Sequence, residues 1–383
     1  MITQWHRLSG GSLLGCFLLC LPCGVPAARG EDSEWKKDSA IAYLDGRQTW
    51  WMKSDMAKQP LDTTCVACHT GLPYALARPS LGGDTARYEA TLANIRKRVE
   101  KWNEVGPIYT STAEGSRGTE AIVNALILGR ADARQGLRTM SPPTAKAFEH
   151  LWALQVEDGP AKGSWPWLQF GKAGFEPWEA IDSGYFGTAL AALAIGTAPG
   201  AIKAAPPDRV AWLRDYLTAN YEGQNLHGRI ALLWASTKLE GILSAERRRK
   251  LIGEIFERQQ NKPGDPAIDG GWNVASLGPW VRKDGTAQIK SPDGYATGLI
   301  VYTLKQAGVA APDQPKLQKG LAWLKRNQEA KTGAWPGNSV HKTRDPDTDE
   351  AWKFPRDAAT AFASMALTDA DARAGDAPRL SSQ

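Results

Sequence analysis

Residues 323–336 read WLKRNQEAKTGAWP: a helix end that finishes in Gln328, then a loop with a glycine, then Trp335. The same order recurs at 151–166, LWALQVEDGPAKGSWP, and at 256–272, FERQQNKPGDPAIDGGW. Glutamine at a helix end can satisfy backbone groups that the helix leaves without partners, while the tryptophan packs on the following turn. Three copies of this order indicate an internal repeat.

A second kind of helix, rich in small residues, alternates with the first, as in GYFGTA at 184–189 and GYATGL at 294–299. Small residues let helices approach closely, which suits an inner ring crowded by neighbours and by an outer layer. The starts of these helices recur at spacings of 66, 44, 66 and 63 residues, near Gly118, Gly184, Gly228, Gly294 and Asp357.

Apolar residues spaced by three and four predict helices along most of the chain, and no long alternating strand pattern occurs. The chain is therefore expected to be all-α. The predicted helices are 36–53, 84–104, 117–131, 143–156, 182–196, 206–220, 226–239, 243–260, 293–307, 313–328 and 356–367.

The segments Gln155 to Trp165, Gln260 to Trp272 and Gln328 to Trp335 resemble the QW motifs of squalene–hopene and oxidosqualene cyclases. These belong to the terpenoid cyclase and protein prenyltransferase superfamily. The resemblance runs from about residue 84 onward and implies an α/α toroid of about six helix pairs around an apolar cavity. Pairing 36–53 with a short helix after His69 completes six pairs.

The catalytic features of that superfamily are missing. The chain contains no D-x-D-D string, which cyclases use as their acid. Once an N-terminal leader is removed, it also has no cysteine outside residues 65–69 for a prenyltransferase zinc site. We therefore expect the fold, and neither cyclase nor prenyltransferase activity.

Residues 1–28 have the pattern of a secretory signal peptide: basic Arg7, an apolar run from 13 to 21, and small residues at Ala27 and Ala28. Cleavage there predicts an exported, periplasmic protein with the toroid at 31–383. Lipid anchoring through Cys16 and an uncleaved membrane anchor are alternatives. No later segment is long and apolar enough to span a bilayer.

The exported chain keeps two cysteines, in Cys65-Val66-Ala67-Cys68-His69. This C-x-x-C-H order is the attachment motif of c-type haem, in which each thiol adds to a vinyl group and His69 becomes the proximal iron ligand. A disulfide, a redox dithiol and half a zinc site are the alternatives. The sequence predicts one covalent haem c in the first repeat.

The distal iron ligand is not fixed by any motif. Closure of the ring favours His341, since its loop then lies near the first repeat. An open iron site is a further alternative, and His150 is expected to be structural. The other candidate ligands are Met140, His227, Met52 and Met56.

A second organisation keeps residues 36–156 as a separate cytochrome c domain with Met140 as distal ligand, followed by helical repeats at 157–383. We favour the merged toroid. Residues 117–131 resemble the other inner helices, and 143–156 ends in a Gln-to-Trp segment.

Polar and aromatic residues near the starts of inner helices are candidates for a rim around the haem edge. Capping and first-turn charge pairing would explain the polar ones equally well. The candidates are Arg117, Glu120, Glu176, Glu179, Asp182, Asp293, Arg356 and Asp357, with Trp165, Trp167, Trp178, Trp272, Trp280 and Trp335.

The 383 residues carry a net charge of +5, with basic residues spread along the chain, which excludes a strongly basic nucleic-acid binder. The expected function is electron transfer by a periplasmic haem c protein with an unidentified redox partner. The alternative is a haem-dependent oxidoreductase acting on an apolar, isoprenoid-like small molecule in the cavity. Residues that would carry catalysis are not identifiable.

Overall fold

The computed structural model describes residues 34–170 and 176–368. The predicted signal peptide at 1–28 and Cys16 lie outside these residues. Among the described helices, none has the length and apolar character needed to cross a membrane.

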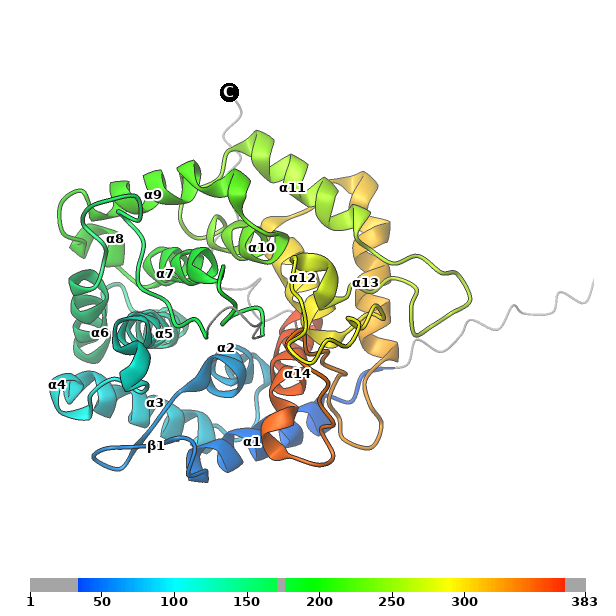
Figure 1. The fold of residues 1–383 in the computed structure, drawn as a ribbon, viewed down its shortest axis with the longest axis horizontal. Helices are drawn as coiled ribbons and strands as arrows, with labels where there is room; N and C mark the ends of the chain where they lie inside the picture. Colours follow the sequence, from blue (N-terminus) through cyan, green and yellow to red (C-terminus); the bar gives the residue numbers. More distant parts are fainter. Residues whose placement is uncertain (1–33, 171–175, 369–383) are drawn as a thin grey trace, which may run out of the picture. The chain divides into compact units, whose positions relative to one another are not determined.

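Six helices form an inner ring within the unit Ser33–Gln383 (Figure 1). Each packs against the next, and the last returns to the first, so the ring is closed. The inner helices are α2 (Leu72–Leu81), α5 (Ala113–Arg134), α7 (Gly184–Thr197), α10 (Leu226–Ala235), α12 (Gly294–Ala307) and α14 (Phe354–Leu367).

A second layer of helices surrounds this ring. It consists of α1 (Lys37–Lys53), α3 (Ala86–Glu100), α6 (Pro142–Ala153), α9 (Arg209–Ala219), α11 (Ala245–Glu257) and α13 (Gln314–Arg326), with the short α4 (Trp102–Val105) and α8 (Ala201–Ala204). The described strands are β1 (Lys58–Gln59) and β2 (Thr63–Thr64), an antiparallel pair in which Lys58 faces Thr64. The prediction of an all-α toroid is confirmed.

The glutamine of each repeat joins two neighbouring outer helices. Gln155 Nε2 donates to the Gly163 carbonyl at 3.1 Å and to the Arg209 carbonyl, at the start of α9, at 3.0 Å. In the second copy Gln259, and not the predicted Gln260, makes these bonds. It donates to the carbonyls of Gly270 and of Lys316, in the first turn of α13, both at 2.8 Å.

The glycine and tryptophan of each repeat are fixed just as specifically. Gly163 has a φ of 91°, and a Cβ there would lie 2.1 Å from the Trp212 carbonyl oxygen, so only glycine fits. The indole N–H of the following Trp165 donates to the Leu151 carbonyl of the outer helix at 2.7 Å. Trp272 and Trp335 make the equivalent 2.7 Å bonds to Ile255 and Leu324.

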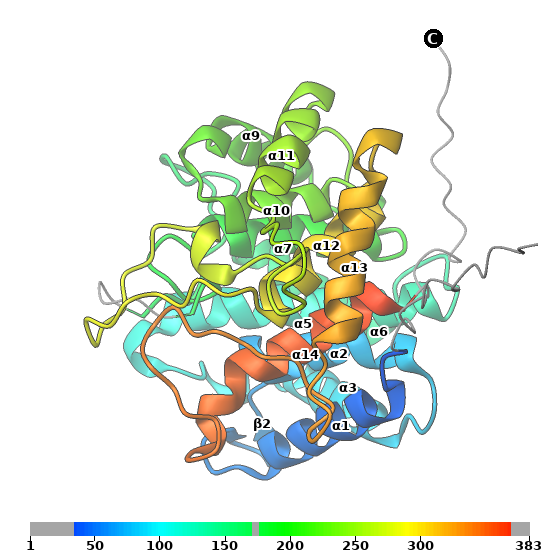
Figure 2. The same ribbon diagram turned by 90° about the vertical axis from the view of Figure 1, so that its right-hand side faces the viewer.

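Close helix approach in the inner ring depends on small residues. A Cβ on Gly298 of α12 would lie 2.5 Å from the backbone nitrogen of Ala363 in α14. The loops after α11 and after α13 gather at one end of the ring (Figure 2). There Arg282 donates to the Ser339 carbonyl at 2.8 Å, which ties these two loops together.

Residues 36–156 contribute two members of the inner ring, α2 and α5, and three of the outer layer. Helix α2 contacts α14, from the end of the chain, so ring closure passes through this N-terminal part. Met140 lies just before α6 and packs against the core.

Candidate functional site

The segment that joins β2 to α2 carries both thiols and His69. Its backbone makes a wide helical turn over Ala67–Gly71 that continues directly into α2. Ala67 takes a φ of 62°, a left-handed conformation that is uncommon outside glycine. A Cβ on Gly71 would lie 1.6 Å from the Val66 carbonyl oxygen, so the turn requires glycine at this position.

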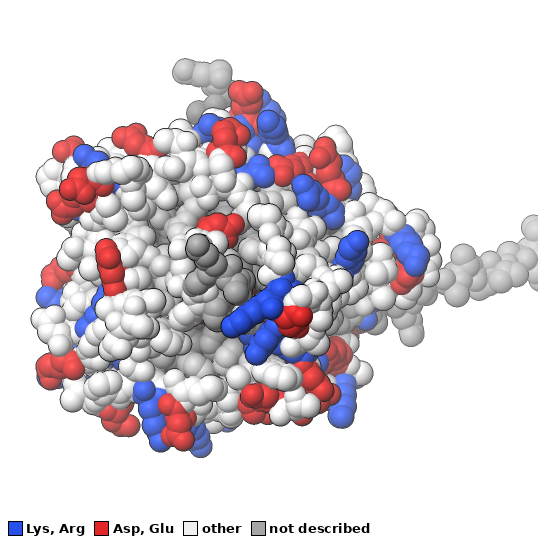
Figure 3. Space-filling view, viewed as in Figure 1, with Lys and Arg blue, Asp and Glu red and all other residues white. Residues whose placement is uncertain are grey.

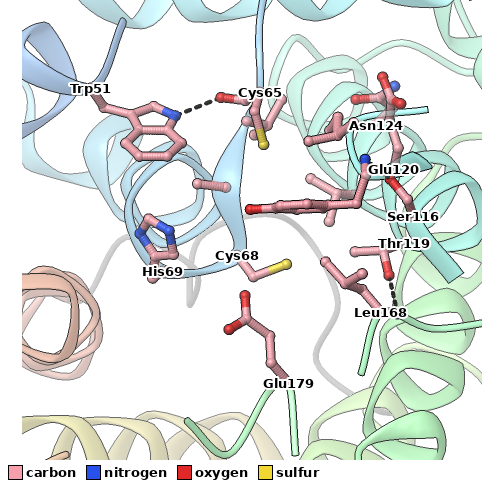
Figure 4. Close-up of a pocket in the computed structure, with 15 residues that line it drawn as sticks. Trp51, Cys65, Cys68, His69, Ser116, Thr119, Glu120, Asn124, Leu168 and Glu179 are labelled. Carbon is pink, nitrogen blue, oxygen red and sulfur yellow. Dashed lines mark hydrogen bonds between the residues drawn. The ribbon is translucent and has the colours of Figure 1, made fainter. Parts of the chain in front are cut away.

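This turn forms one wall of a cavity beside inner helix α5. The cavity encloses about 520 Å³ of empty space, part of it open to solvent. The two sulfur atoms face it in Figure 4, and the Glu179 carboxylate lies close to Cys68. The lining residues are Trp51, Cys65, Val66, Ala67, Cys68, His69, Ile108, Tyr109, Ser116, Thr119, Glu120, Val123, Asn124, Leu168 and Glu179.

Both cysteines are free thiols held in their protonated form. Burial raises the pKa of Cys65 to about 12, and burial together with the Glu179 charge raises the pKa of Cys68 well above its ordinary value. The Trp51 indole N–H donates to the Cys65 carbonyl at 2.5 Å and so holds the start of the turn against α1.

His69 is held between aromatic rings. Its imidazole stacks on Phe354 at a centroid distance of 3.5 Å and meets the Trp51 ring edge-on at 5.0 Å. Burial lowers the pKa of His69 to about 3, so the ring is neutral at physiological pH. A neutral imidazole is the form that binds metal ions.

Two carboxylates reach the cavity in different electrostatic settings. Burial, reinforced by the charge of Glu176, raises the pKa of Glu179 to about 8, so this group keeps its proton at neutral pH. Glu120 of α5 is instead paired with the buried Arg98, whose Nε lies 2.6 Å from its Oε1. The cavity therefore contains one protonated acid and one ion-paired carboxylate.

A second cavity, between the inner helices, also has Cys68 in its lining. Its empty space is about 440 Å³, part of it open to solvent, and its lining is almost entirely apolar. Its residues are Cys68, Leu72, Pro73, Leu76, Trp178, Phe186, Leu190, Ala231, Trp234, Tyr295, Leu299, Ala358 and Phe362.

Of the predicted haem-binding residues, Cys65, Cys68 and His69 come together at the first cavity, and His341, the predicted distal ligand, does not line it. The His341 backbone N–H donates to the Ser339 hydroxyl at 3.2 Å. His227 is buried against Tyr295, with 2.7 Å between Nε2 and the phenol oxygen. His150 stacks on Trp102 in the outer layer.

The three methionine candidates also lie away from the cavity lining. Met52 receives a contact at 3.9 Å from the Thr91 hydroxyl, and the side chain of Met56 is exposed. Met140 belongs to the packing around α6.

The polar residues predicted to form a rim have different roles in the structure. Glu179 and Glu120 line the cavity, whereas Glu176 holds the loop after α13 through Ser339, Val340 and Arg344. Asp293 caps α12 by accepting from the Ala296 N–H at 2.9 Å, as the capping interpretation predicts. The Asn225 side-chain amide donates to Asp182, and Arg117 donates to the Trp102 carbonyl. Arg356 forms an ion pair with Glu329.

Asp357 is not a cap: it lies inside the first turn of α14 and accepts bonds from Tyr43, Arg47 and Thr70. Sequence reasoning missed the aromatic, hydroxyl and amide members of the cavity: Trp51, Tyr109, Ser116, Thr119 and Asn124. No local motif marks them, because they come together only through packing of α1 and α5 against the turn.

The cavity fits a covalently attached haem c in its donor set. Both thiols and the imidazole line the same space, and the other walls are largely apolar. Within the described part of the chain, no cluster of three or more His, Cys, Asp or Glu side chains is arranged to hold a bare metal ion. The donor set therefore argues against a zinc site, which needs further cysteine or histidine ligands.

No protein-family model matches the chain, and no curated protein matches it. Solved structures do. An inactive variant of the α-1,6-mannanase GH76A of Salegentibacter sp. HEL1_6, in complex with α-1,6-mannotriose, aligns with a TM-score of 0.52 at 10% identity, covering 87% of this chain and 99% of that one. The structure of the GH76A α-1,6-mannanase from the same organism aligns with 0.51 at 9% identity and the same coverage.

A possible member of the GH105 family from Klebsiella pneumoniae subsp. pneumoniae MGH 78578 aligns with a TM-score of 0.47 at 12% identity, covering 94% of this chain and 98% of that one. The likeness to the mannanase structures shows that the fold is the α/α toroid of these glycoside hydrolases. The cyclase resemblance implied a toroid, and a related toroid fold is confirmed. The comparisons found neither a cyclase nor a cytochrome c family.

These comparisons correct the expected function. The solved structures that share the fold are glycoside hydrolases, and no cytochrome c is among them. The prediction of a periplasmic electron-transfer protein is wrong on this finding, and so is its alternative, a haem oxidoreductase acting on an isoprenoid-like substrate. The electron-transfer prediction rested on the C-x-x-C-H motif. The isoprenoid-like substrate of the alternative rested on the resemblance of the QW segments, which reports helix packing that unrelated toroid proteins share.

Proposed function

We propose that the protein binds and processes a carbohydrate in the cavity beside α5. The observation that carries this proposal is Glu179, a carboxylic acid with a pKa raised to about 8 in the wall of that cavity. An acid protonated at neutral pH can donate its proton to the leaving oxygen of a glycosidic bond. The mannanases that share the fold act on α-1,6-linked mannose, so a glycan is the substrate class to test first.

Other features of the cavity suit a sugar. Hydrolysis of a glycoside ordinarily needs a second carboxylate, and Glu120, paired with Arg98, lies in the same lining. Trp51 and Tyr109 offer rings for stacking, and Thr119 and Asn124 offer hydrogen bonds to hydroxyl groups. In Figure 3 most of the charged side chains lie around the rim of this face, while a group of Lys and Arg side chains with an acidic one beside it, and a separate acidic patch, lie nearer its middle.

The chemistry would not copy that of the mannanase. The inactive variant of that enzyme has two consecutive aspartates changed to asparagine, and this chain contains no two consecutive aspartates. The acid is therefore assigned to Glu179 from its own burial and charge environment.

The experiment compares the wild-type protein with Glu179→Gln on a panel of oligosaccharides that includes α-1,6-mannan, following release of reducing ends. We expect Glu179→Gln to lose at least about 100-fold in rate. The matched control is Glu149→Gln on the exposed face of α6, which should behave as the wild type. The proposal fails if the wild type cleaves no member of the panel, or if Glu179→Gln keeps its activity.

We also propose a covalent haem c as the cofactor of this cavity, a second candidate with its own supporting observation. Both thiols of the C-x-x-C-H segment and His69 line one space. Cys65 and Cys68 would form the two thioether bonds, and His69 would be the proximal iron ligand. A bound haem supplies a redox-active iron, and the proposal concerns its attachment alone, without an electron-transfer role.

The test is production of the full chain in a host with the cytochrome c maturation system, followed by haem staining on a denaturing gel. Stain is expected in the wild type and absent from the Cys65→Ala/Cys68→Ala double variant. Because a haem and a sugar would compete for the same space, the stain also decides between the two occupants. Unstained wild-type protein overturns the haem proposal and leaves the carbohydrate proposal standing.

Export is part of the haem proposal, since covalent haem attachment takes place outside the bacterial cytoplasm. We propose cleavage near Ala27 or Ala28 and a periplasmic location. Separately, we propose an apolar small molecule as the ligand class for the second cavity. Mass spectrometry of the protein from a periplasmic fraction tests the cleavage. A mature chain that begins at Met1 or Cys16 would contradict it.

A further inference from the structure

Asp357 connects the last inner helix to the turn that carries the thiols. Its buried carboxylate accepts three side-chain bonds, from the Tyr43 hydroxyl at 2.8 Å, Arg47 Nε at 2.7 Å and the Thr70 hydroxyl at 2.7 Å. Tyr43 and Arg47 lie on α1, and Thr70 directly follows His69. The carboxylate thus joins three segments that are far apart in the sequence.

The Thr70 hydroxyl links Asp357 to the His69 imidazole through two hydrogen bonds. The Thr70 oxygen lies 2.8 Å from His69 Nδ1. A hydroxyl has a single proton to donate, and Thr70 donates it to Asp357 Oδ2. The bond to His69 must then run the other way, from an Nδ1–H group to the Thr70 oxygen.

The direction of this chain of bonds depends on Asp357 being ionised. Burial raises the pKa of Asp357, and Arg47, in an ion pair of 2.7 Å with Oδ1, opposes that shift and favours ionisation. The guanidinium is itself buried and also pairs with Glu350, and a buried cation of this kind favours ionised carboxylates beside it. With Asp357 ionised, His69 carries its proton on Nδ1 and leaves the Nε2 lone pair free.

We infer that Asp357 and Thr70 are positioning residues that hold His69 as the Nδ1–H tautomer and present Nε2 to the iron of a haem. This inference rests on the haem attachment proposed above. The Phe354 and Trp51 rings complete the arrangement, because they pack on the imidazole and oppose rotation of its plane. A hydrogen bond from the other ring nitrogen is the general way in which proteins orient a ligating histidine.

The electronic consequence can be measured. An Nδ1–H group that donates to an oxygen polarised by a carboxylate makes Nε2 more basic, which stabilises the oxidised iron. Thr70→Val keeps the shape of the side chain and removes the acceptor, so the midpoint potential should shift upward. Thr70→Ser keeps the hydroxyl and should restore the wild-type value.

The holoprotein experiment measures the haem-to-protein ratio and the midpoint potential of wild type, Thr70→Val, Thr70→Ser and Asp357→Asn. Tyr43→Phe is the control, because it removes a bond to Asp357 without touching Thr70 or His69. Thr70→Val and Asp357→Asn should both move the potential upward, and Tyr43→Phe should move it less. Equal potentials in wild type and Thr70→Val would overturn the inference.

A second measurement separates failure of this inference from failure of the haem proposal. Nitrogen-15 spectra of histidine in the full chain, produced without haem maturation, report the tautomer directly. The Nδ1–H form is expected in the wild type and is lost in Thr70→Val. An Nε2–H form in the wild type would mean that Thr70 donates to His69, which overturns the inference whether or not haem is attached.

Discussion

Gln328, just after the last outer helix, exchanges two hydrogen bonds with Lys36, just before the first. The Lys36 N–H donates to Gln328 Oε1 at 2.6 Å, and Gln328 Nε2 donates to the Lys36 carbonyl at 2.9 Å. The two residues are 292 positions apart, so this pair closes the outer layer of helices. Gln155 and Gln259 use the same amide to join consecutive outer helices, which makes closure one more step of the repeat.

Replacing Gln328 by alanine should therefore destabilise the whole ring. The variant loses both bonds to Lys36 and a third to the Gly333 carbonyl, and we expect the free energy of unfolding to fall by about 1–3 kcal/mol. Urea unfolding measures it. Gln224→Ala is the control, since Gln224 bonds only locally to the Asn220 carbonyl and should cost no more than about 0.5 kcal/mol. Equal losses in the two variants would contradict a closing role for Gln328.

The helices were predictable from their apolar spacing, although inner helices such as α7 are buried on nearly all sides, and the observed ends lie within a few residues of the predicted ones. The repeat was predictable from its glutamine and tryptophan. Adjacent residues Gln259 and Gln260 could not be told apart, since one residue of helix rotation decides which amide faces α13. Gln260 instead donates to the Lys290 carbonyl at 2.6 Å.

Adding a single methyl group at Gly71 should disrupt the turn that holds the thiols. In Gly71→Ala the new Cβ would meet the Val66 carbonyl oxygen at 1.6 Å, so the turn must open. We expect a loss of more than about 2 kcal/mol in unfolding free energy, of the kind seen when backbone geometry is incompatible. Thermal and urea unfolding provide the measurement.

The control for Gly71→Ala is Gly46→Ala in the middle of α1, where nothing lies within 4 Å of the new Cβ. Alanine is the better helix former, so this variant should gain about 0.5–1 kcal/mol. A Gly71→Ala protein as stable as Gly46→Ala would show that the turn tolerates a side chain.

The site was only partly predictable. The spacing of Cys65, Cys68 and His69 brings them together whatever the fold, because they are neighbours in sequence. The bond from Thr70 to Asp357 spans 287 residues and depends on ring closure, so the sequence offered only a capping role or a place in the polar rim for Asp357. Glu179 was identifiable as a rim residue, but its raised pKa follows from burial and from Glu176, which only the fold sets.

Stability should depend on pH through Glu179. Its pKa is raised to about 8 in the folded state, so between pH 5 and pH 8 the folded chain holds a proton that the unfolded chain releases. Stability must then fall as the pH rises through this window and level off above it. Asp293, with a pKa raised to about 7 by burial, acts in the same direction.

Glu179→Gln removes one of these two contributions and leaves the other. Relative to this variant, the wild type should lose about 1–3 kcal/mol between pH 5 and pH 8.5, measured by urea unfolding at each pH. Glu149→Gln on the exposed face of α6 should follow the wild-type profile. Parallel profiles for wild type and Glu179→Gln would mean that Glu179 is ionised at neutral pH, and would also weaken its assignment as the acid.

The ion pair in the cavity wall gives the last prediction. Arg98 and Glu120 are both buried, and Arg98 Nε lies 2.6 Å from Glu120 Oε1. Glu120→Ala leaves the guanidinium buried, with the Thr63 hydroxyl of β2, at 2.8 Å, as its remaining hydrogen-bond partner among the described residues. Breaking a buried pair from one side should cost about 3–5 kcal/mol in unfolding free energy. Glu149→Ala, which breaks the exposed pair with Lys146, should cost less than about 1 kcal/mol. A small loss in Glu120→Ala would show that water reaches Arg98 through the cavity, since only solvent could replace the missing carboxylate.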